Sequence, residues 1–170
     1  VYMFPMSFAQ ERLWFLDELE PGSSFYNIAS ASRLTGELDV RALERSLNEI
    51  VNRHEILRTT FTSRNGRPAQ VIQSRAKVSL VVIDLRGLPG PEREAEVRRV
   101  AAREAGRPFD LEKGPLLRAV LSRLDPPDAV EPEHALILVM HHIISDGWSM
   151  EVFIRELAAL YGAYLEERPN

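Results

Sequence analysis

The sequence predicts a mixed α/β lobe in which a mixed β-sheet is covered by helices. Residues 135–144, "ALILVMHHII", are apolar at almost every position, as expected for a central strand with both faces covered. Residues 149–166 then place apolar side chains at helical intervals. The 170 residues are 45% hydrophobic, which is enough for one cored domain or for one lobe of a larger domain.

Helix and strand signals divide the first part of the chain. Ser7 stands three residues before Gln10, a capping-box spacing that predicts a short helix. Residues 25–36, "FYNIASASRLTG", predict a strand, and Asp39 is placed to cap a second helix. The apolar stripe of that second helix consists of Val40, Leu43, Leu47, Ile50 and Val51.

The remaining signals alternate between strands and one charged helix. Apolar and polar residues alternate from Leu57 to Phe61, and Asn65-Gly66 predicts the turn of a β-hairpin. A helix is expected from Pro91 to Gly106. Further strands are expected at 78–85 and 114–125, the second of them exposed on one side, followed by a solvent loop at 125–134.

Composition excludes several classes of function. The net charge of −4 provides no broad cationic surface for the phosphates of nucleic acids. No window approaches the roughly 18 apolar residues of a membrane span. With no cysteine there is no disulfide, thiolate metal site or cysteine nucleophile, and a cytoplasmic location is the simplest expectation.

The segment "MHHIISDGWS", residues 140–149, contains the candidate site. Consecutive side chains on a strand point to opposite faces, so His141 and His142 cannot enter the same cleft, and one of them should be structural. An imidazole titrates near neutral pH and is therefore suited to proton transfer. Asp146 follows four residues after His142, and Gly147 permits close approach of a ligand to the backbone.

Simpler interpretations of the same segment stay open. Asp146 can cap the following helix, break the strand in an Asp-Gly turn, or pair with an arginine. Trp148 is expected in the core, and Ser149 is expected to cap the helix rather than act as a nucleophile. No metal site is predicted, because adjacent strand histidines diverge and His54 and His134 lack metal-ligand spacing.

Three segments in order resemble the condensation domains of non-ribosomal peptide synthetases, members of the HHxxxDG superfamily with chloramphenicol acetyltransferase. They are "SFAQERLWF" (7–15), "RHEILRTTF" (53–61) and "MHHIISDGWS" (140–149). The resemblance implies a chloramphenicol acetyltransferase-like two-layer sandwich lobe. It further implies that residues 1–170 form the N-terminal lobe of a two-lobed domain whose C-terminal lobe is absent here.

The resemblance also implies an activity in antibiotic or other secondary-metabolite biosynthesis. Such a domain is an acyltransferase that joins a carrier-bound aminoacyl or peptidyl thioester to the amine of a carrier-bound acceptor. Its partners are the donor and acceptor peptidyl carrier proteins, whose phosphopantetheine arms hold both substrates, so the domain needs no cofactor of its own. The histidine segment is most similar to the subtype that joins an L-donor to an L-acceptor, and the isolated lobe is expected to be inactive.

By this resemblance His142 faces the reacting groups, as a base or by positioning substrate, while His141 and Asp146 are architectural. Gly147 is a candidate for a backbone contact to the oxyanion. Arg58 is expected at a strand position, as a buried ionic partner of the HHxxxDG loop, with Arg53 as the competitor for that role.

Two other functions compete with this interpretation. A stand-alone coenzyme A-dependent acyltransferase is compatible with the HHxxxDG segment alone. A non-catalytic domain that only docks carrier proteins is the second alternative, although the intact His142 and Asp146 argue against it.

Overall fold

A four-stranded mixed sheet forms the centre of the chain. The computed structural model describes residues 1–125 and 129–166. The strands lie in the order β2-β7-β6-β5; β5 and β6 are parallel and the other neighbours are antiparallel. The mixed sheet expected from the sequence is thereby confirmed. Its strands are β2 (Asn27–Thr35), β5 (Leu80–Asp84), β6 (Leu117–Arg123) and β7 (Glu133–His141).

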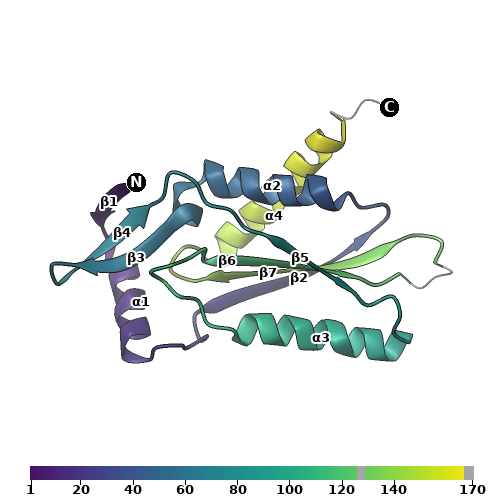
Figure 1. The fold of residues 1–170 in the computed structure, drawn as a ribbon, viewed down its shortest axis with the longest axis horizontal. Coiled ribbons are helices and arrows are strands. Elements are labelled where there is room, and N and C mark those ends of the chain that lie inside the picture. The colour runs from purple at the N-terminus through teal and green to yellow at the C-terminus, as the bar shows by residue number, and fades with distance from the viewer. Residues whose placement is uncertain (126–128, 167–170) are drawn as a thin grey trace.

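Helices cover both faces of this sheet (Figure 1). Helix α2 (Val40–Arg53) and helix α4 (Gly147–Glu166) lie together on one face, and α3 (Gly90–Gly106) lies on the other. The predicted stripe of α2 is buried at Leu43, Leu47 and the residues after them, because it faces the sheet and α4. Strand β7 is buried along nearly its whole length, as its apolar sequence predicts.

A second, three-stranded sheet lies at one end of the molecule, beside α1 (Phe8–Leu19) (Figure 1). Its order is β1-β4-β3, where β3 (Thr59–Arg64) and β4 (Arg67–Ile72) form the predicted hairpin. Strand β1 (Tyr2–Pro5) was not predicted, because all four residues are exposed and show no alternation. The predicted capping box of Ser7 and Gln10 is present at the start of α1.

Two sequence expectations about exposure and boundaries are corrected. Strand β6 is not exposed on one side, since it lies between β5 and β7 and is also covered by helices. The hairpin strand begins at Thr59 rather than Leu57, because Glu55–Arg58 form the 3₁₀ turn η1. Part of the predicted solvent loop, residues 126–128, lies outside the described residues.

No helix within residues 1–125 and 129–166 combines the length and apolar character needed to cross a membrane.

Candidate active site

The histidine pair lies where β7 gives way to the turn that leads into α4. His141 is the last residue of β7 and is only 2% exposed, whereas the His142 side chain is exposed. The backbone N–H of His142 donates to the carbonyl of Tyr26 (2.8 Å), which fixes the turn against the segment before β2. The two rings therefore lie in different environments, as alternation along a strand requires.

A backbone hydrogen bond determines the proton position on His142. Its Nδ1 lies 2.6 Å from the carbonyl oxygen of Ser145. A carbonyl can only accept, so Nδ1 carries the proton and donates. In the neutral ring Nε2 then has a free lone pair, the arrangement that a proton acceptor needs.

His141 is held among aromatic rings beneath the turn. The Phe109 ring is perpendicular to it in a T-shaped pair, with centroids 6.3 Å apart, and the centroid of the Tyr26 ring is 6.4 Å away. His141 Nδ1 accepts a hydrogen bond from the backbone N–H of Ile143 (3.1 Å), so its neutral ring is protonated on Nε2. Burial, followed by the charge of the adjacent His142, lowers the pKa of His141 to about 4.

Asp146 caps α4. Its Oδ1 accepts from the backbone N–H of Ser149 (2.7 Å) and from the Ser149 hydroxyl (2.6 Å). These two hydrogen bonds hold the pKa of Asp146 below its ordinary value. The expectation that Ser149 is the capping residue was wrong: α4 starts at Gly147, two residues earlier than the apolar stripe indicates, so Ser149 lies inside the first turn.

Gly147 and Trp148 are both exposed at the start of α4. Apart from its chain neighbours and the backbone of α4, a Cβ added at Gly147 would meet no atom within 4 Å, so the fold leaves open space beside this residue. Trp148 is 72% exposed, which corrects its expected place in the core. It precedes the buried Met150 by two residues, about 200° around a helix, which accounts for its exposure.

Neither arginine of the second motif forms a hydrogen bond or ion pair with the turn between β7 and α4. The Arg58 side chain is nearly buried, at 12% exposed, but it donates to the carbonyl of Gln73 and pairs with Glu55 (3.2 Å). Arg53 lies 3.7 Å from Glu156 and the same distance from Glu49. The expected ion pair with the HHxxxDG loop is replaced by these local partners, because η1 turns Arg58 toward the end of β4.

A cleft of about 580 Å³ opens beside His142. The turn forms one wall and α1 forms the other. The contribution of α1 was not predicted, because no residue pattern in either segment indicates that α1 packs near the end of β7. The residues that line the cleft include Gln10, Arg12, Leu13, Leu16, Tyr26, His142, Ser145, Asp146 and Ser149.

No group of three or more histidine, aspartate or glutamate side chains in the described part of the chain is arranged to hold a metal ion.

Comparison with known proteins identifies the family of this chain. The model of the condensation domain family matches residues 2–170. This chain belongs to the condensation domain family. The chain is 54% identical to a linear gramicidin synthase of Brevibacillus parabrevis over 163 residues, covering 96% of the chain and 3% of that protein. It is 50% identical to the chondramide synthase cmdD of Chondromyces crocatus over 168 residues, covering 99% of the chain and 4% of that protein.

Solved structures of the family share the fold. The starter condensation domain of rhizomide synthetase RzmA superimposes with a TM-score of 0.87 at 25% identity, covering 98% of this chain and 39% of that one. The first condensation domain of the CDA synthetase gives a TM-score of 0.85 at 26% identity, covering 99% of this chain and 42% of that one. The chain thus spans less than half of these solved chains, and its mixed α/β fold is that of the family.

Proposed function

We propose that this chain is the N-terminal lobe of a condensation domain that forms a peptide bond, and that His142 is its catalytic residue. The observation that carries the proposal is the exposed His142 ring beside the cleft, with Nδ1 donating to the Ser145 carbonyl. In the proposed reaction a donor aminoacyl or peptidyl thioester transfers its acyl group to the amine of an acceptor amino acid. The histidine segment favours the subtype that joins an L-donor to an L-acceptor.

The chemistry assigns a defined role to Nε2. The neutral amine of the acceptor attacks the thioester carbonyl, gains positive charge as the C–N bond forms, and must lose a proton as the thiolate leaves. Nε2 accepts this proton or orients the amine by a hydrogen bond. Positioned base catalysis contributes about 10²- to 10⁴-fold, and holding two tethered substrates in line contributes as much or more.

The start of α4 completes the proposed site. Gly147 is the exposed first residue of the helix, and the backbone N–H groups of a helix N-terminus favour negative charge. The open space beside Gly147 leaves room for the substrate carbonyl to approach, so its backbone is the proposed contact for the oxyanion. His141 and Asp146 hold the turn, and no intrinsic cofactor or metal has a role.

The proposed partners follow from the reaction. Donor and acceptor peptidyl carrier proteins deliver the substrates on phosphopantetheine arms, and the C-terminal lobe encloses the open side of the cleft. We therefore expect the 170-residue chain alone to be inactive. The absence of cysteine suits the proposed cytoplasmic location of such a synthetase.

The test uses the complete domain that contains this chain, with both carriers loaded. The His142→Ala variant should form dipeptide about 10²- to 10⁴-fold more slowly than the wild type. His54→Ala is the matched control, because His54 is half-exposed, bonds to Glu156 (2.9 Å) and does not line the cleft. It should retain wild-type activity, and a normal dipeptide yield from His142→Ala would remove His142 from catalysis.

The same assay distinguishes the two alternatives. Acyl transfer from free acyl-coenzyme A, at a rate that carrier-bound donor does not exceed, would indicate a stand-alone acyltransferase. Carrier binding without any amide product from the complete domain would indicate a docking domain.

A further inference from the structure

The C-terminal end of α3 is bound by side chains from two strands of the central sheet. The last carbonyls of a helix have no partner within the helix and need donors from elsewhere. Asn27 Nδ2 donates to the carbonyls of Ala105 and Arg107, at 2.8 Å each. The Arg118 guanidinium donates to the carbonyls of Glu104 (2.9 Å), Arg107 and Pro108 (3.2 Å).

These two donors flank β7, the strand that ends at His141. Asn27 on β2 is paired in register with His141 on β7, and Arg118 on β6 is paired with Val139. The side chains of both neighbouring strands thus attach the end of α3 at the place where β7 ends. The Arg118 side chain is 14% exposed, and its Nε lies 3.7 Å from the buried carboxylate of Glu104.

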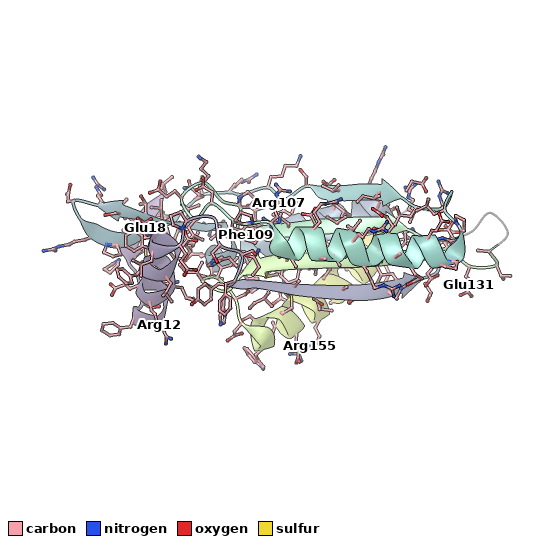
Figure 2. All side chains as sticks on the ribbon, turned by 90° about the horizontal axis from the view of Figure 1, so that it is seen from below. Arg12, Glu18, Arg107, Phe109, Glu131 and Arg155 are labelled. Carbon is pink, nitrogen blue, oxygen red and sulfur yellow. The ribbon has the colours of Figure 1, made fainter. Side chains whose placement is uncertain are left out.

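Phe109 connects this attachment to His141. The Arg118 guanidinium carbon lies 3.7 Å from the centre of the Phe109 ring, a close cation–π contact. The same ring forms a T-shaped pair with the His141 imidazole, with the ring centroids 6.3 Å apart. Figure 2 shows Phe109 beside Arg107, at the end of α3 that faces α1. One face of Phe109 is thereby occupied by the cation while the ring also contacts the imidazole.

We propose that Arg118 is a positioning residue for the active site: it fixes the end of α3 and the Phe109 ring, which holds His141 in the orientation that shapes the His142 turn. The role of His142 itself rests on the function proposed above.

The contacts of His141 show how its orientation reaches His142. Its Nδ1 accepts from the Ile143 N–H (3.1 Å), and its carbonyl accepts from the Ile144 N–H (3.1 Å). A rotated His141 ring leaves the Ile143 N–H without this acceptor inside the protein, so the turn must shift. The shift changes the distance from His142 Nδ1 to the Ser145 carbonyl. This hydrogen bond determines which ring nitrogen of His142 carries the proton.

The test measures the His142 tautomer by ¹⁵N NMR of the ring nitrogens, together with kcat and KM for amide formation, in the complete domain. The wild type should show His142 protonated on Nδ1. Arg118→Ala should give a mixture of tautomers and a kcat lower by about 10- to 100-fold, with KM little changed, because misplacement of about 1 Å costs rates of this order. Phe109→Leu leaves the Arg118 hydrogen bonds in place and should produce the same two effects, which keeps the proposal testable if Arg118→Ala does not fold.

Arg107→Ala is the matched control. The Arg107 side chain is 64% exposed, lies at the same helix end and pairs with Glu104 (3.6 Å), and its backbone carbonyl is kept in the variant. It should change neither the tautomer nor kcat. A wild-type tautomer and kcat in Phe109→Leu overturn the positioning role even if His142→Ala is inactive, whereas an active His142→Ala overturns the proposed function and leaves the tautomer measurement valid.

Discussion

His141 gives the protein a predictable dependence of stability on pH. Its pKa is about 4 when folded and about 6.5 when the chain is unfolded and the ring is solvated. Between these two values the unfolded chain binds a proton that the folded protein does not, so the free energy of unfolding falls as pH falls from 6.5 to 4. The loss from this one residue is about 3 kcal/mol, and it is complete below pH 4.

Urea unfolding between pH 4 and pH 7 measures this loss. Burial also lowers the pKa of His134, so the wild type contains two histidine contributions of the same sign. His141→Asn keeps an acceptor for the Ile143 N–H but cannot titrate, and should show a shallower pH dependence than the wild type. Equal slopes for the two proteins would contradict the assignment to His141.

The environment of a residue was predictable from the sequence where it depends on neighbours in the chain. It was not predictable where it depends on segments that are distant in the chain. The divergence of His141 and His142 follows from strand geometry alone. Trp148 was misplaced because the start of α4 was set two residues late; a helix from Gly147 places it opposite Met150. The partners of Arg58 depend on η1 and on the end of β4, and the residue spacing near Arg58 predicts neither of them.

Asp146 stabilises the start of α4. The sequence also allowed Asp146 to break the strand or to pair with an arginine. Asp146→Ala removes the acceptor of the Ser149 N–H and hydroxyl and should lower the melting temperature. Asp146→Asn keeps a capping oxygen without the charge and should restore most of the stability, because asparagine caps helices as well as aspartate does.

Thermal unfolding of the two variants and the wild type measures this difference. A role in an ion pair would instead make Asp146→Asn as unstable as Asp146→Ala. Ser149→Ala is a suitable control, because it removes only the hydroxyl contact and keeps the backbone donor.

At the scale of elements, segments with a strong hydrophobic period were predicted correctly from the sequence, and a strand without such a period was missed. The stripe of α2 and the apolar run of β7 fixed both elements, since each pattern reports a face that must be buried. Strand β1 is defined by its pairing with β4, some seventy residues away in the chain, and carries no burial pattern of its own. The contribution of α1 to the cleft is likewise a result of packing between distant segments.

At the scale of the whole molecule, large apolar side chains are exposed at the end that contains α1 and β1. Phe8 is 92% exposed and Phe25 is 82% exposed, and Phe25 lines a groove of about 320 Å³ with Leu16 and Leu19. Exposed apolar side chains that gather into one patch mark an interaction site. In the proposed function the rest of the complete domain covers this apolar surface, which is exposed in the chain alone.

The fluorescence of the hydrophobic dye 8-anilinonaphthalene-1-sulfonate tests this difference. Each phenylalanine provides roughly 150–250 Å² of surface, so the double variant Phe8→Ser/Phe25→Ser should reduce dye binding by the isolated chain. In the complete domain the same substitutions should change it little. Val130→Ser is the control: Val130 is 99% exposed and adjoins Glu131, at the opposite end of the molecule from Arg12 and Glu18 (Figure 2), so its effect should be the same in both proteins. An equal reduction by the double variant in both proteins would show that the two rings stay exposed, and the apolar end of this lobe would then need another partner.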